Sequence, residues 1–96
     1  MIYKTETITV ADTSVGFTAA NLNLAESLYG RNIKRIVCTI DTAQLRYWED
    51  GTDPTTSAGN IANIGDVITI DGSDARNFRA IRTTSTSSKI RASYEI

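Results

Sequence analysis

Residues 33–40 have the sequence Ile-Lys-Arg-Ile-Val-Cys-Thr-Ile. Most of these side chains are apolar, and the two basic residues lie near the start of the segment. A short, apolar, β-branched run of this kind is typical of a central strand that enters a core. Cys38 is the only cysteine of the chain, so no intramolecular disulfide can form. We expect Cys38 to be buried as a small hydrophobic residue.

The chain on both sides of this strand repeats a pattern of short strands separated by turn residues. Residues 2–10 alternate loosely between apolar and polar side chains, which is the period of a strand with one buried face. Segments rich in Asp, Gly, Ser and Thr separate the later runs. We expect strands at residues 2–10, 33–40, 43–49, 67–70, 78–83 and 89–96, and a short strand or a strand-like edge at 15–17.

Two connections are open to more than one interpretation. Residues 19–29 contain helix-compatible types, but the segment is short. We predict at most a helical turn or an irregular connection there, ended by Gly30. Asp41-Thr42 permits a reversal, and we expect the strands at 33–40 and 43–49 to form a hairpin.

About seven short strands at spacings of roughly ten residues are typical of a β-sandwich or small β-barrel. A chain of 96 residues has room for one domain. We therefore predict a single all-β domain over residues 1–96, a small antiparallel β-sandwich or barrel of an immunoglobulin-like or jelly-roll-like kind. The expected core contains Ile8, Val10, Phe17, Ile36, Cys38, Ile40, Leu45, Tyr47, Ile68, Ile70, Phe78, Ala80, Ile90, Ala92 and Tyr94.

The composition argues against an enzyme. Histidine is absent, which removes the commonest general base, the usual partner of a serine or cysteine nucleophile, and a frequent metal ligand. Zinc sites built on cysteine need several thiolates, and this chain has one. The aspartates lie mostly in turn-like stretches, where their side chains accept backbone N–H groups. We expect no catalytic residues, no metal and no cofactor.

The tetrad Asp-Gly-Thr-Asp at 50–53 is repeated as Asp-Gly-Ser-Asp at 71–74. Oxygen-rich loops of this kind can bind calcium, but neither tetrad continues into the spacing of a calcium-binding helix-loop-helix. Two reversals built from the same turn residues are the favoured interpretation. Within the first tetrad, Gly51 is expected to have a positive φ.

The net charge of −1 gives no global positive field, so nucleic acid is an unlikely partner. The N-terminus lacks the pattern of a secretory signal, and no run of about 18 apolar residues is present. We therefore expect a soluble protein that is made in a cytoplasm and does not bind a membrane.

The candidate interface or ligand residues surround the longest predicted loop, residues 50–59. In the strand before it, Leu45 and Tyr47 should share one face, with Arg46 and Trp48 on the other. Three roles remain open for Trp48: an anchor in a protein interface, a cap over the end of the core, or a platform for a sugar ring. The full candidate set is Arg46, Trp48, Asp50, Asp53, Thr55 and Thr56.

The run Leu-Arg-Tyr-Trp-Glu-Asp-Gly-Thr-Asp-Pro-Thr-Thr-Ser at 45–57 resembles the signature I-R-Y-T-x-D-G-T-x-P-T-x-S, which is found in two settings. One is the immunoglobulin-like accessory domain at the C-terminus of chitobiase-type enzymes. The other is a group of small tailed-bacteriophage proteins, and that resemblance extends over most of the chain. It includes Val15-Gly16-Phe17-Thr18, Gly65-Asp66-Val67-Ile68, Phe78-Arg79-Ala80-Ile81-Arg82 and Lys89-Ile90-Arg91-Ala92-Ser93-Tyr94.

The phage resemblance implies a non-catalytic virion structural protein that is made in the host cytoplasm. It implies a capsid decoration or stabilising protein bound to the assembled shell, with a minor neck or tail component as the alternative. The implied partners are the major capsid protein or other virion proteins, and further copies of the same chain. The accessory-domain resemblance leaves a second alternative, a carbohydrate-binding or adhesive module. Because no enzyme accompanies the domain here, the phage setting is favoured.

Overall fold

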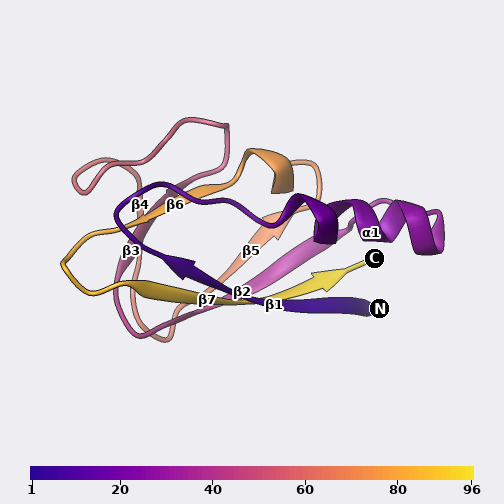
Figure 1. The fold of residues 1–96 in the computed structure, drawn as a ribbon, viewed down its shortest axis with the longest axis horizontal. Helices are drawn as coiled ribbons and strands as arrows, with labels where there is room; N and C mark the ends of the chain where they lie inside the picture. The colour runs from indigo at the N-terminus through magenta and orange to yellow at the C-terminus, as the bar shows by residue number, and fades with distance from the viewer.

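The computed structural model describes residues 1–96 as two antiparallel β-sheets, one α-helix and one short 3₁₀ helix (Figure 1). Sheet A has the strand order β1-β7-β2-β5, and sheet B has the order β4-β3-β6. The predicted all-β fold of seven strands is confirmed, and it is a sandwich. The elements are β1 Ile2–Val10, α1 Ala19–Tyr29, β2 Arg35–Asp41, β3 Leu45–Trp48, β4 Asn60–Ala62, β5 Val67–Asp71, the 3₁₀ helix η1 Ala75–Asn77, β6 Arg79–Arg82 and β7 Ser88–Glu95.

The central strand predicted at 33–40 is β2, which lies between β5 and β7 in sheet A. Ile36, Cys38 and Ile40 point into the core and are buried, while the residues between them are more exposed. Burial raises the pKa of the Cys38 thiol to about 12. The thiol is therefore protonated at neutral pH and serves as a packed apolar group.

The hairpin predicted between residues 33–40 and 43–49 is wrong. Both edges of β2 are already paired, and β3 instead pairs with β4 and β6 in the other sheet. Thr42, with a φ of 76°, lies in the connection that carries the chain between the sheets. The buried Ser88 hydroxyl donates to the Ala43 carbonyl at 2.6 Å and fixes this crossing. Sequence alternation does not distinguish such a crossing from a hairpin, because both use a short polar turn.

The connection predicted at 19–29 is a complete helix of 11 residues, so the expectation of at most one turn is wrong. Leu22 and Ala25 are buried, and this tertiary packing stabilises a helix that is too short to form alone. Gly30 ends the helix as predicted, with a φ of 62°. Neither α1 nor η1 has the length and apolar character needed to cross a bilayer.

The remaining differences from the sequence prediction concern short elements. Residues 15–17 form a single bridge, in which Val15 pairs with Ala80. The three-residue strand β4 was not predicted, because its sequence lies between two turn-rich stretches. All predicted core residues are buried except Tyr47 and Ile68, which pack partly buried against the core. The core also includes residues that were not predicted, Leu22, Ala25, Ala43, Ala62 and Ala75.

A chain of aromatic rings runs through the interior. The ring of Phe17 stacks on Phe78 with centroids 4.6 Å apart, and Phe78 lies 5.7 Å from Tyr47 of β3. In the other direction Phe17 contacts Tyr94 of β7 edge-on at 5.8 Å. Tyr94 lies 6.0 Å from Tyr3 of β1. The chain of rings therefore connects the two sheets.

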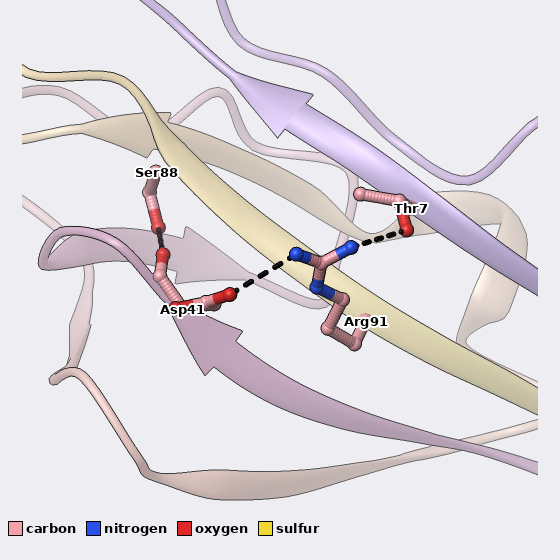
Figure 2. A network of polar contacts seen from close by, with 4 residues as sticks. All are labelled: Thr7, Asp41, Ser88 and Arg91. Carbon is pink, nitrogen blue, oxygen red and sulfur yellow. Dashed lines mark hydrogen bonds and ion pairs between the residues drawn. The ribbon is translucent and has the colours of Figure 1, made fainter.

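Polar contacts hold neighbouring strands together on the outer face of sheet A (Figure 2). Arg91 of β7 donates to the Thr7 hydroxyl of β1 at 3.0 Å, and its guanidinium lies 3.2 Å from the Asp41 carboxylate of β2. One side chain thus spans three adjacent strands. Arg91 and Asp41 are both well exposed. We therefore expect this network to orient these side chains on the surface and to contribute little to the free energy of unfolding.

A second polar network joins α1 to sheet A. The Tyr94 hydroxyl donates to one carboxylate oxygen of Glu6, and the hydroxyl of Thr18, the N-cap residue of α1, donates to the other. Burial alone would raise the pKa of Glu6, but hydrogen bonds from Thr18, Tyr94 and Asn21 outweigh burial, and the pKa is lowered. Glu6 therefore favours the folded state as a carboxylate.

We expect Glu6→Gln to lower the free energy of unfolding at pH 7 by about 1–2 kcal/mol, because charge-assisted hydrogen bonds are replaced by weaker ones at a partly exposed site. The folded pKa lies below the ordinary value of 4.5. The stabilisation is therefore complete above pH 4.5 and is lost as the pH falls through the folded pKa. Urea unfolding across this range should show the two proteins converging in acid. A difference that stays constant with pH would contradict this role of Glu6.

Candidate functional site

The candidate residues Arg46 and Trp48 lie on the outward side of β3. Leu45 is fully buried and Tyr47 packs against the core, as predicted. Since side chains alternate along a strand, Arg46 and Trp48 point away from the core. Trp48 is half-buried and does not belong to the core cluster, so the interpretation of Trp48 as a cap over the core is not supported.

Strand pairing places further side chains beside these two residues. Arg46 lies directly opposite Ile61 of β4 and Ile81 of β6, and Trp48 lies opposite Arg79 of β6. Directly opposed residues of antiparallel strands share one face of the sheet. We call the resulting surface the outer face of sheet B; it consists of Arg46, Trp48, Ile61, Arg79 and Ile81.

The positive charge of Arg79 is not balanced by a carboxylate. Its guanidinium donates to the backbone carbonyls of Phe78 at 2.7 Å and Arg76 at 3.1 Å. The only two ion pairs of the structure join Arg35 to Glu95 and Arg91 to Asp41, all in sheet A. The outer face of sheet B thus combines a tryptophan, two isoleucines and two arginines outside any ion pair.

Arg46 also anchors the loop of residues 50–59. Its guanidinium donates to the Gly59 carbonyl at 2.8 Å, while its Nε atom is buried without a hydrogen-bond partner. Gly59, with a φ of 135°, approaches so closely that a Cβ atom there would lie 3.1 Å from the Cβ of Arg46. Pro54 of the same loop is buried. The loop is therefore fixed against β3 at the border of the outer face of sheet B.

The candidate residues of the loop have local roles. Asp50 accepts the backbone N–H of Thr52 at 3.0 Å, and this hydrogen bond lowers the pKa of Asp50. Asp53 accepts the Ser14 hydroxyl at 2.7 Å. The Thr55 hydroxyl accepts the backbone N–H of Ser57 at 3.3 Å. Thr56 is exposed and makes no side-chain hydrogen bond in the structure.

The repeated tetrads form the same kind of turn. Asp71 accepts the backbone N–H of Ser73 at 3.0 Å, as Asp50 does for Thr52, so the interpretation of both tetrads as reversals is confirmed. No group of three or more Cys, Asp or Glu side chains is placed to hold a metal ion. Gly51 has a φ of 89°, which confirms the predicted positive value.

We expect Gly51→Val to lower the free energy of unfolding by about 1–3 kcal/mol, because a β-branched residue is strained at positive φ. The Gly51 N–H also donates to the Asn77 carbonyl at 3.0 Å, so the turn cannot easily relax. Thr55→Ala, in the same loop, should cost less than about 0.5 kcal/mol because the side chain is exposed. Equal losses for the two variants in a denaturant series would show that the turn tolerates a side chain at residue 51.

Neither of the two surface hollows includes a predicted site residue. The larger, about 470 Å³, lies between α1 and the turn at residues 71–76. The smaller, about 370 Å³, lies over β1 and β7. The structure therefore brings Arg46 and Trp48 together on the outer face of sheet B, which the loop of residues 50–59 partly covers at Arg46. Asp50, Asp53, Thr55 and Thr56 of that loop do not belong to this face.

Sequence reasoning missed Ile61, Arg79 and Ile81. Their alternation with inward-facing residues is visible in the sequence, but their neighbours on β3 depend on pairings across 14 or more intervening residues. Comparisons of the chain with models of known families, with curated proteins and with solved structures find no match.

Proposed function

We propose that this chain is a structural protein of a tailed-phage virion, a decoration or stabilising protein that binds the assembled shell through the outer face of sheet B. The resemblance in the order of several short motifs along the chain supports the setting. The single observation that carries the choice of surface is the register that places Trp48 beside Arg79, whose charge no carboxylate balances.

The chemistry of this face suits a protein partner. Tryptophan and arginine are the side chains that most often dominate the energy of protein interfaces. Neither surface hollow is lined by residues of this face, whereas small-molecule sites are typically enclosed. Arg79 favours a partner surface that offers a carboxylate or backbone carbonyls, because pairing there would replace its present contacts with carbonyls of its own chain.

A shell presents many identical sites in fixed positions. Copies that also contact one another would bind such a lattice more tightly than one copy binds one site. Stabilisation of the shell then follows from mass action, since a protein that binds only the assembled form favours assembly. The proposed role requires no catalytic residue and no cofactor.

We expect Trp48→Ala to weaken binding to assembled particles at least about tenfold, because removal of a central aromatic anchor typically costs 2 kcal/mol or more. Cosedimentation with phage shells at increasing protein concentration measures this change. Thr39→Ala is the matched control, since Thr39 is exposed on sheet A. Equal binding by both variants and the wild type would show that another surface makes the contact.

Binding experiments with the same purified protein distinguish shell binding from the neck-or-tail and carbohydrate-binding alternatives. Cosedimentation with purified tails and not with shells would place the protein at the neck or tail. Fluorescence of Trp48 titrated with polysaccharides tests the carbohydrate-binding alternative, because Trp48 is the only tryptophan. A saturable shift with a glycan, together with no binding to any particle, would replace the virion proposal with that of a sugar-binding module.

A further inference from the structure

The edge of sheet A that β1 forms carries a continuous row of backbone groups without partners. β1 is the first strand in the order β1-β7-β2-β5, so it pairs on one side only, with β7. In an antiparallel sheet each residue directs its backbone N–H and C=O to the same side, and that side alternates from one residue to the next. Every second residue of β1 therefore directs both groups away from the sheet.

The hydrogen bonds of β2 identify which residues these are. The Ile40 N–H donates to the Asp66 carbonyl at 2.9 Å, and the Ile40 carbonyl accepts the Gly65 N–H at 2.8 Å, so Ile40 faces the side of β5. Its neighbour Thr39 therefore faces β7, where it is paired with Arg91. The odd-numbered residues of β7 thus face β2, and the even-numbered ones face β1.

The same alternation continues into β1. Ala92 of β7 is opposite Glu6, so the backbone groups of Glu6 face β7 and those of Thr5, Thr7 and Thr9 face outward. These three threonines are exposed, and their backbone N–H and C=O groups have no hydrogen-bond partner within the chain. We call these six groups, two from each threonine, the free edge of β1.

The free edge of β1 has a defined length. At its start, the register with β7 shifts between Ile2 and Lys4, as at a β-bulge. At its end, the Ala11 carbonyl accepts the Arg82 N–H at 3.0 Å, where the chain leaves sheet A. Bulges and lysines interrupt pairing at sheet edges. A strand added to this edge is therefore confined to residues 5–9.

This row of groups is its own complement. A second copy placed antiparallel about a two-fold axis at Thr7 has Thr7 opposite Thr7 and Thr5 opposite Thr9, so every group of the free edge is bonded. An axis at Glu6 leaves Thr9 opposite the bulge and opposes two Glu6 carboxylates, which is unfavourable. An axis at Ile8 leaves Thr5 opposite Ala11, whose carbonyl is already bonded.

Charged groups do not oppose the axis at Thr7. The charged side chains of β1 itself, Lys4 and Glu6, lie opposite Val10 and Ile8 of the second copy. The Glu6 carboxylate accepts hydroxyl groups of its own chain. The other charged groups around the edge are the Met1 ammonium and Glu95 at its start, Lys89 and Arg91 of β7 beside it, and Asp12 and Arg82 beyond its end. The pairs between residues 5 and 9 of the outer face are all threonines, so hydrogen bonding selects the register.

We propose that two copies of this chain pair through the free edge of β1, antiparallel about a two-fold axis at Thr7. The two sheets A then form one continuous sheet of eight strands, four from each copy. The interface is isologous and closes at a dimer. The axis is perpendicular to the sheet, so the outer faces of both sheets B point to the same side. The pairing does not use the outer face of sheet B, so it stands or falls separately from shell binding.

Hydrogen exchange measured by NMR tests the proposal on the unaltered protein. The N–H groups of Thr5, Thr7 and Thr9 have no protection within one chain, so their exchange should slow at least about tenfold between dilute and concentrated protein. Thr69 is the internal reference. It is opposite Val37 and faces the free side of β5 by the same alternation, so its exchange should be fast at every concentration.

Thr7→Pro removes an N–H that only the second copy can bond. Sedimentation velocity up to about 1 mM protein should show a dimer of the wild type, and Thr7→Pro should raise its dissociation constant at least about tenfold. Thr69→Pro makes the same change on the β5 edge and should dimerise like the wild type. Thr7→Val removes the hydroxyl that accepts Arg91 (Figure 2) but keeps the N–H, and should also dimerise like the wild type.

Two double variants test the register. Thr5→Lys with Thr9→Glu places opposite charges across from each other in both outer pairs, so this variant should dimerise at least as tightly as the wild type. Thr5→Lys with Thr9→Lys opposes like charges in the same pairs and should raise the dissociation constant about tenfold or more. Equal dimerisation of the two variants would show that another register, or another surface, forms the contact. Circular dichroism checks that every variant is folded.

A wild-type protein that is monomeric at 1 mM, with fast exchange at the three threonines, would overturn the proposal. A dimer that Thr7→Pro leaves intact would also overturn it. If the wild type is monomeric and Thr7→Pro, unlike Thr69→Pro, loses binding to shells, the edge binds an extended strand of a shell protein and not a second copy. Trp48→Ala should dimerise like the wild type, so failure of dimerisation and failure of shell binding are distinguishable.

Discussion

Gly72→Ala is expected to remove a large part of the stability of this domain. A Cβ atom at residue 72 would lie 1.8 Å from the Ile33 carbonyl oxygen and 2.6 Å from its carbon. Both are backbone atoms, so no side chain can rotate away. The Gly72 N–H also donates to the Lys34 carbonyl at 3.0 Å, which holds the end of β5 against the entrance to β2.

The methyl group can fit only if this backbone contact separates, and we expect a loss on the order of 3–5 kcal/mol in the free energy of unfolding. That is much of the total for a small domain, about 5–15 kcal/mol. Urea unfolding followed by circular dichroism measures the loss. Gly65→Ala is the matched control, because Gly65 has a φ of 88° but open space around it. It should cost about 1 kcal/mol. Similar losses at both positions would mean that the close approach at Gly72 is not rigid.

Phe78→Ala is expected to have the second largest effect. The ring is fully buried, stacks on Phe17 and contacts Tyr47, so it links the two sheets through the aromatic chain. Truncation of such a side chain costs about 3–5 kcal/mol, from lost burial and the cavity left behind. Phe78→Leu keeps much of the volume and should lose less. A loss below about 1.5 kcal/mol for Phe78→Ala would show that the core collapses around the gap.

The sequence predicted the strands better than their pairing. Alternation at residues 2–10 and the apolar run at 33–40 are local signals, and both became strands of sheet A. The partner of β3 is not a local property. Its pairing with β6 joins residues more than 30 positions apart, and a polar turn after Asp41 is equally compatible with a hairpin or a change of sheet.

The helix α1 shows how tertiary contacts can override weak local preference. Its sequence contains Leu22 and Ala25 at a spacing that faces one side of a helix, but eleven residues are too few to form a helix alone. Burial of those two residues stabilises it, and the Thr18 hydroxyl, which makes no capping hydrogen bond to the helix, donates to Glu6 and ties the start of α1 to β1. None of these contacts is visible in the sequence, and only the end of the helix at Gly30 was predicted from it.

Part of the candidate site could be predicted from the sequence, and part depends on how the strands pair. The outward orientation of Arg46 and Trp48 follows from alternation within one strand, and it was predictable. The neighbours Ile61, Arg79 and Ile81 come from other strands, and only the register brings them together. The aspartates of the loop were correctly interpreted as turn residues, since an Asp side chain that accepts a nearby N–H is a local feature.

An electron cryomicroscopy reconstruction of phage particles saturated with the protein would show whether the outer face of sheet B docks on the shell. We expect one copy of the sandwich at symmetry-related positions on the shell, with β3 and β6 facing the particle and Trp48 in the contact. Particles without such density, or with the outer face of sheet A against the shell, would contradict it.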